Sequence, residues 1–150
     1  MAKLVVLHKL ESDKEERLRA DFLGAQQHHR LQQQKLQGLT QFRSEYMSQL
    51  MSKAQAGLSS AGFSHYQNFI AKIEQAIAQQ SQTVETAKRV MQQRQQLWQQ
   101  QRIRSEAVAK LIAKKEQQKQ VAMAKAEQKM LDEFSINQFF ARRLAQGSSS

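Results

Sequence analysis

The chain contains no proline, and no glycine occurs between Gly62 and Gly147. Proline and glycine are the residues that most often interrupt a helix, so this stretch has nothing to end one. Residues recur through it with alternating steps of four and three, the heptad pattern of a coiled-coil seam. The seam residues are Tyr66, Ile70, Ile73, Ile77, Gln80, Val84, Ala87, Met91, Arg94 and Trp98, followed by Ser105, Val108 and Ile112. The pattern predicts a helix over about residues 64–143, on the order of 120 Å long at ~1.5 Å per residue.

A second heptad seam precedes this helix and predicts another helix over about residues 4–54. Its residues are Leu18, Phe22, Ala25, His29, Gln32, Leu36, Leu39, Phe42, Tyr46 and Leu50. Between the two seams, residues 55–63 contain a cluster of glycine and serine, which favours a turn. Ser64 and Gln67 have the S-x-x-Q spacing of a capping box, which predicts that the second helix starts at Ser64.

These segments predict an all-α fold, a long antiparallel two-helix coiled-coil hairpin in one domain. A turn centred near residues 59 and 60 would place Tyr46 opposite Ile73, Phe42 opposite Ile77, and Phe22 against Trp98. The second helix would then overhang the first by roughly thirty residues, at ~1.5 Å each. Large apolar residues continue along the overhang, which indicates a partner or self-association. Residues 147–150 read as a flexible tail.

The charge of the chain is uneven and basic. The formal net charge is +10, and between Lys88 and Lys129 the bases face only Glu106, Glu116 and Glu127. A basic helix of this kind attracts acidic protein, nucleic acid or anionic lipid, or serves only as a solvated face. The chain has no cysteine and no apolar stretch near the ~20 residues that span a bilayer, so we expect a soluble cytoplasmic protein.

No catalytic pattern occurs in the sequence. The four histidines, His8, His28, His29 and His65, lack a second ligand at helical spacing, and there is no phosphate-binding loop or nucleophile motif. We therefore expect no enzymatic activity, no cofactor, no metal and no small-molecule substrate.

Near the turn, the second helix has more apolar surface than one seam requires. A second stripe, Phe69, Ile73, Ala76 and Gln80, runs at i, i+4, i+7 and i+11, and the first helix matches it with Leu39, Phe42, Tyr46 and Met47. Either the seam is broad because an α-helix slips ~20° per heptad, or the stripe is a docking face for a protein partner.

Four segments resemble the FliJ family of flagellar type III export proteins. They are residues 42–46 (FRSEY), 66–70 (YQNFI), 73–77 (IEQAI) and 128–134 (QKMLDEF), and the likeness covers nearly the whole chain in length and turn position. The resemblance implies an antiparallel coiled coil similar to the central stalk of rotary ATPases. It also implies a non-catalytic cytoplasmic component, peripheral to the inner membrane at the flagellar base.

The partners that the resemblance implies are the hexameric export ATPase, the membrane export-gate protein and export chaperones. By the same resemblance, the gate-docking residues would be Phe69, Ile73, Ala76, Gln80, Leu39, Phe42 and Tyr46. The terminal end would enter the ATPase ring, with contacts at Lys110, Lys114, Lys115 and Lys119. The alternative is a basic coiled coil that binds nucleic acid, which the scarcity of aromatic residues in the basic zone disfavours.

Overall fold

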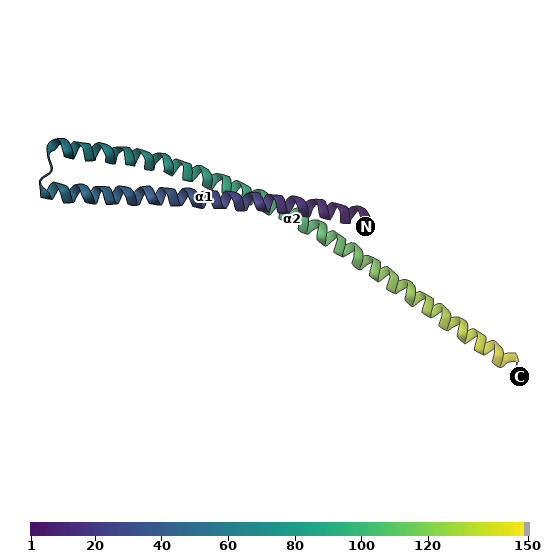
Figure 1. Ribbon diagram of the computed structural model, residues 1–150. Helices are drawn as coiled ribbons and strands as arrows, with labels where there is room; N and C mark the ends of the chain where they lie inside the picture. The colour runs from purple at the N-terminus through teal and green to yellow at the C-terminus, as the bar shows by residue number, and fades with distance from the viewer. Residues whose placement is uncertain (149–150) are drawn as a thin grey trace. The chain divides into compact units, whose positions relative to one another are not determined.

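The computed structural model describes residues 1–148, which form two helices. Helix α1 spans Ala2–Ala56 and helix α2 spans Ser60–Ser148. A loop of residues 57–59 joins them, so they run antiparallel (Figure 1). No strand occurs among the described residues. The predicted all-α antiparallel hairpin is therefore confirmed.

The helix ends differ from the prediction because the turn is shorter than residues 55–63. Gly57 ends α1 with a φ of 101°, a left-handed conformation that glycine adopts without a steric penalty. Ser59 caps α2: its Oγ accepts a hydrogen bond from the Gly62 backbone N–H at 3.1 Å. Helix α2 thus begins before Ser64, so the predicted cap is wrong. It also continues through Gly147, and residues 149–150 of the predicted tail lie outside the described residues.

The chain divides into two units, and each is described here by itself. One comprises residues 12–103, called the loop unit. The other comprises Met1–Glu11 together with Arg104–Ser150, called the terminal unit.

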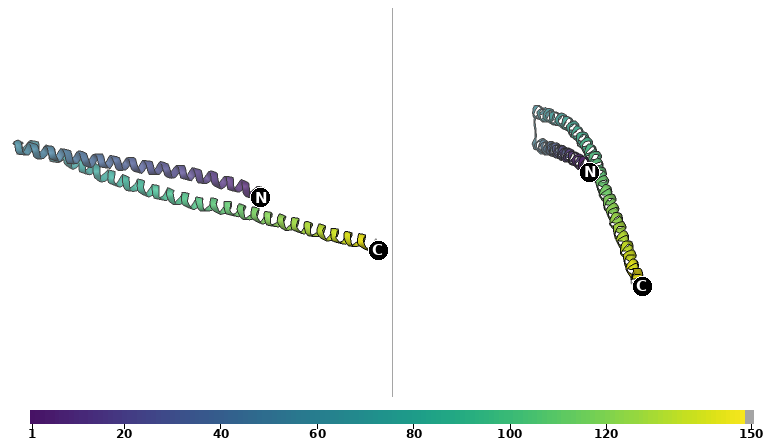
Figure 2. Two further views of the ribbon diagram at one scale, coloured as in Figure 1. Left: turned by 90° about the horizontal axis from the view of Figure 1, so that it is seen from below. Right: turned by 90° about the vertical axis from the view of Figure 1, so that its right-hand side faces the viewer.

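In the loop unit, α1 and α2 lie side by side in Figures 1 and 2, packed along the predicted seams. Phe22, Leu50, Ile70, Ile73 and Ala87 form the buried core. Phe22 stacks on Trp98 with ring centroids 5.5 Å apart, as predicted. Most of the other seam residues are half-buried, the expected result when one stripe per helix is covered.

Near the loop, aromatic rings of the two helices contact each other. Tyr46 lies against the rings of Tyr66 and Phe69, with centroids 5.0 and 4.7 Å away. Phe42 contacts Phe69, with centroids 6.3 Å apart. These ring contacts lie closer to the loop than the predicted partners Ile73 and Ile77, whose pairing with Tyr46 and Phe42 stays a prediction.

A polar pair interrupts the apolar seam of the loop unit. Gln80 is only 7 % exposed, and its Nε2 donates to the Gln32 carbonyl oxygen at 3.0 Å and to Gln32 Oε1 at 2.8 Å. Buried polar groups are costly unless they are paired, so this pair favours the one register in which both amides meet.

In the terminal unit, the short α1 segment covers α2 only as far as Ile112. Ser105 is buried, and its Oγ donates to the Glu11 carbonyl oxygen at 3.1 Å. Val108 and Ile112 are half-buried, and every residue from 113 to 147 is exposed. Beyond Ile112, the next two seam positions are Lys115 and Lys119, so the apolar part of the seam ends at Ile112.

Candidate functional site

Four aromatic rings gather beside the loop in the loop unit, and we call them the aromatic cluster. They are Phe42 and Tyr46 of α1 with Tyr66 and Phe69 of α2, and neighbouring ring centroids lie 4.7–6.3 Å apart. The heptad spacing brings one aromatic ring to the helix surface at each turn on both sides of the loop. Aromatic pairs at these separations contribute more stability than their buried area alone would give. The ring contacts therefore hold the cluster in a defined arrangement.

The cluster is only partly covered by the chain itself. Phe42 is 45 % exposed and Phe69 is 38 % exposed, whereas Tyr46 and Tyr66 are half-buried. Large exposed rings on a rigid support are typical of the residues that dominate protein–protein binding.

The predicted docking residues divide between the surface and the seam. Ile73, at 5 % exposed, and Gln80 lie between the helices. Leu39 and Ala76 are half-buried beside them. Of the predicted set, Phe42 and Phe69 are therefore the side chains with substantial area free for a partner.

A shallow apolar hollow of about 440 Å³ adjoins the loop. It is lined by Met47, Leu50, Met51, Ala54, Gln55 and Phe63. Methionine side chains are flexible and polarisable, so they adapt to irregular partner surfaces. Apart from Met47 and Leu50, sequence reasoning did not single out these residues.

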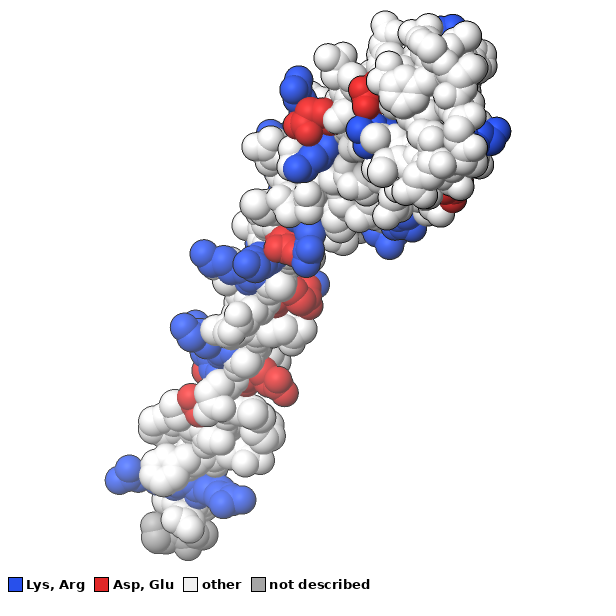
Figure 3. Space-filling view, turned by 90° about the vertical axis from the view of Figure 1, so that its left-hand side faces the viewer, with Lys and Arg blue, Asp and Glu red and all other residues white. Residues whose placement is uncertain are grey.

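One signal in the sequence could have found this surface, namely the lack of charge. Between Glu45 and Lys72, Lys53 is the one Asp, Glu, Lys or Arg residue. The loop end is correspondingly almost bare of charged side chains in Figure 3. The Lys53 ammonium lies 5.3 Å from the Tyr66 ring centroid, and a side-chain hydrogen bond with Tyr66 raises the pKa of Lys53 above 10.5. The loop end therefore has few charged side chains, with the Lys53 ammonium held near the Tyr66 ring.

The predicted basic contacts lie in the terminal unit. Lys110, Lys114, Lys115 and Lys119 are all exposed on α2. Beyond them, Phe134, Phe139 and Phe140 are exposed as well. At about 100° per residue, these three rings leave the helix in directions ~100–140° apart. The Phe139 and Phe140 rings meet edge to face, with centroids 6.0 Å apart. Phenylalanine side chains therefore leave the end of α2 in more than one direction, interspersed with charged residues such as Asp132 and Arg142.

Among the described residues, no group of three or more His, Asp or Glu side chains could hold a metal ion. In the same part of the chain, no helix has a stretch with the length and apolarity needed to cross a membrane.

A family model described as Flagellar FliJ protein matches residues 1–144. The chain belongs to the FliJ family. It is thus a component of the flagellar protein export apparatus, in a family whose members act without catalysis, and the predicted resemblance is confirmed. The searches of curated proteins and of solved structures gave no match.

Membership decides between the two functions that the sequence left open. A flagellar export component accounts for the coiled-coil hairpin and for exposed apolar surfaces at both the loop and the end of α2. Nucleic-acid binding has no such support.

Proposed function

We propose that this FliJ-family protein is a stalk and adaptor that links the hexameric export ATPase to the membrane export gate and handles export chaperones. It works in the cytoplasm, peripherally bound at the inner membrane through these partners. The loop end docks on the gate, and the end of α2 enters the ATPase ring.

The observation that carries the proposal is the distribution of exposed phenylalanines on α2. Phe134 leaves the unpaired helix on one side and the Phe139–Phe140 ring pair leaves it on another, so a partner that encloses the helix would cover all three. A flat partner would leave at least one ring in water. A ring-shaped assembly meets this requirement.

The basic side chains before this segment suit the same partner. Lys110, Lys114, Lys115 and Lys119 are exposed, and within the described part of the chain none has an ion-pair partner within 4.0 Å. Spread positive charge attracts an acidic channel without fixing one orientation.

The loop end has the opposite character, which suits a specific contact. The aromatic cluster offers Phe42 and Phe69 as anchors, and little charge surrounds them. Binding energy at such surfaces rests on a few large side chains.

The test is binding of purified variants to the purified ATPase and to the soluble domain of the gate protein. Phe42→Ala combined with Phe69→Ala should weaken gate binding about tenfold or more and leave ATPase binding unchanged. Truncation after residue 125, or Lys→Glu changes at 110, 114 and 115, should do the reverse. Leu23→Ala, which removes an exposed apolar side chain elsewhere, is the matched control.

Substitutions of Ile73 or Gln80 are poor tests of gate binding, because both side chains are buried in the seam and their loss would also destabilise the fold. Helix content and melting temperature must match the parent protein in every binding comparison. If the Phe42/Phe69 variant keeps its helix content and binds the gate normally, the gate contact is assigned to the wrong end.

A further inference from the structure

Two rows of side chains flank the seam of the loop unit on one side. On α1 the row is Asp21, His28, Lys35 and Phe42, and on α2 it is Phe69, Ala76, Thr83, Val90 and Leu97, both at intervals of seven. Residues seven apart lie on the same face of a helix. Two contacts bring the rows together: the Phe42 and Phe69 ring centroids lie 6.3 Å apart, and His28 and Thr83 line one hollow.

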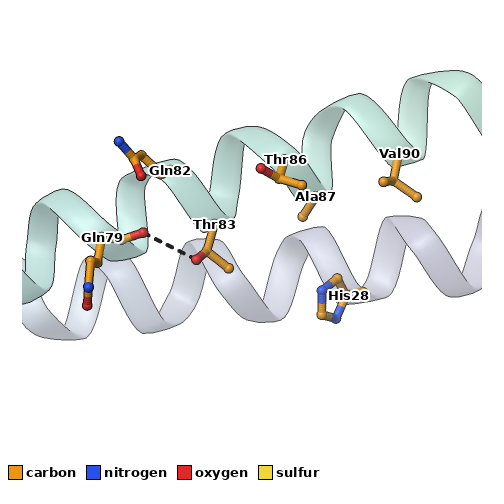
Figure 4. Close-up of a pocket in the computed structure, with 7 residues that line it drawn as sticks. All are labelled: His28, Gln79, Gln82, Thr83, Thr86, Ala87 and Val90. Carbon is orange, nitrogen blue, oxygen red and sulfur yellow. Dashed lines mark hydrogen bonds between the residues drawn. The ribbon is translucent and has the colours of Figure 1, made fainter.

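The hollow between the rows has a volume of about 640 Å³ (Figure 4). It is lined by His28, Gln79, Gln82, Thr83, Thr86, Ala87 and Val90. In Figure 4, His28 rises from α1 below the side chains of Thr86, Ala87 and Val90 on α2. Six of the seven lining residues have no ionisable side chain and the seventh is His28, so the hollow lacks the charged groups that orient a small-molecule ligand.

Large apolar side chains in the rows remain uncovered. Phe69, Val90 and Leu97 are each about two-fifths exposed, and Phe42 is exposed slightly more. Between Phe69 and Val90, the α2 row has only the small side chains of Ala76 and Thr83. Large side chains at both ends of the row with small ones between them leave a groove into which another helix can pack.

The charges beside this groove are mostly positive. Lys35 stands in the α1 row, Lys72 stands three residues after Phe69, and Arg94 stands four residues after Val90. Among the described residues, none of the three has an ion-pair partner within 4.0 Å. The acidic residues at equivalent places are Asp21, in the α1 row, and Glu45, three residues after Phe42. A second copy of this chain, with a net charge of +10, would be repelled. The groove complements a helix with acidic flanks.

We propose that the loop unit binds an amphipathic, acidic α-helix of a partner protein in this groove, as the third helix of a local bundle. The partner helix places small and apolar residues against Thr83, Val90 and Leu97, and its carboxylates reach Lys35 and Arg94. The gate anchors proposed above, Phe42 and Phe69, stand at the loop end of the two rows. The helix site lies further along the rows, at Thr83, Val90 and Leu97, and it does not use the end of α2, so it goes beyond the gate and ATPase contacts.

A synthetic peptide of three heptads, with Leu and Ala on one face and Glu on the flanks, is the probe. Because the chain has no cysteine, a fluorophore can be placed at a single site, Thr86→Cys in the groove or Ser81→Cys as control. Ser81 is exposed and lies ~140° round the helix from Thr86. Saturable binding should change the signal at Thr86 and leave Ser81 unaffected. The same peptide with Lys in place of Glu should not bind.

Thr83→Glu combined with Val90→Glu should weaken binding of the acidic peptide about tenfold, since like charges then meet in the groove. Ala78→Glu combined with Gln92→Glu adds the same charge to exposed positions outside the rows and should leave binding unchanged. All four side chains are exposed, so both variants should keep the helix content and melting temperature of the parent.

The proposal is wrong if the acidic peptide does not bind, if the Lys peptide binds equally well, or if both labels respond. It is also wrong if the Thr83/Val90 variant binds as the parent does. A signal at Thr86 that grows with protein concentration in the absence of peptide would show that a second copy occupies the groove instead.

Discussion

The loop unit and the unpaired part of α2, residues 113–147, contain similar apolar residues but arrange them differently. In the loop unit the apolar residues keep one heptad phase and are buried against the other helix. In residues 113–147 that phase carries Lys115, Lys119 and Lys129 before it reaches Ile136 and Phe140, and the other large apolar side chains point in other directions. Placement relative to the seam, rather than apolar content, separates the region that folds on itself from the one left free for a partner.

The largest expected difference between these regions is the cost of losing a phenylalanine. Phe22→Ala should lower the free energy of unfolding by about 3 kcal/mol, because Phe22 is 8 % exposed and stacks on Trp98. Phe134→Ala, at a side chain 61 % exposed, should change it by less than about 0.5 kcal/mol. Urea unfolding followed by helix content measures both. Equal losses would mean that residues 113–147 are packed in solution.

The two regions should differ almost as much in how readily their backbone hydrogen bonds open. An unpaired helix depends on local propensity, whereas the paired region opens only when the seam is disrupted. Backbone amides of residues 66–101 should therefore exchange with solvent deuterium on the order of 100-fold more slowly than those of residues 115–140. Added ATPase should slow exchange in the second group. Similar protection in both groups without a partner would contradict the comparison.

Amide side chains offer a smaller contrast. Gln80→Ala should cost about 1–2 kcal/mol of unfolding free energy, because it leaves the Gln32 groups unpaired in the seam. Gln120 also bonds a side chain, Glu116 Oε1 at 3.2 Å, but in the exposed region. Gln120→Ala should be within about 0.5 kcal/mol of the parent. Thermal unfolding of the two variants tests whether burial, rather than the bond itself, sets the cost.

The smallest effect concerns the start of α2, which makes the pairing possible. Ser59→Ala should lower the unfolding free energy by about 1 kcal/mol through loss of the cap on Gly62 N–H. Ser64→Ala is the control, since Ser64 lies inside the helix, and should have almost no effect. The reverse result would restore the sequence-predicted cap.

The seams were predictable because burial repeats with the heptad and few residues depart from it. The departures are local: Arg94 is exposed while Gln95 is half-buried, and Phe42 is exposed while Arg43 is half-buried. Arg43 forms an ion pair with Glu74 of the other helix, with its Nη2 2.8 Å from Glu74 Oε1. A pattern of apolar residues does not predict such a pair.

The loop and the docking face were harder to predict. Ser59 and Ser64 are both plausible caps, and the choice depends on where Gly57 adopts its left-handed conformation. The predicted docking stripe mixed Phe69, which is exposed, with Ile73, which is buried. One residue of shift in register moves a side chain ~100° round the helix, so a heptad pattern alone does not separate seam from flank.

The loop of residues 57–59 also bears on how the chain reaches this fold. Contacts beside it join residues close in sequence, such as Tyr46 and Tyr66, whereas the bond from Ser105 to Glu11 spans 94 residues. Closing a short segment costs less chain entropy than closing a long one. We therefore expect folding to nucleate at the aromatic cluster and pairing to advance outward from the loop. On the ribosome, the part of α1 near the loop would find its partner first, while its beginning waits until residues near 105 have emerged.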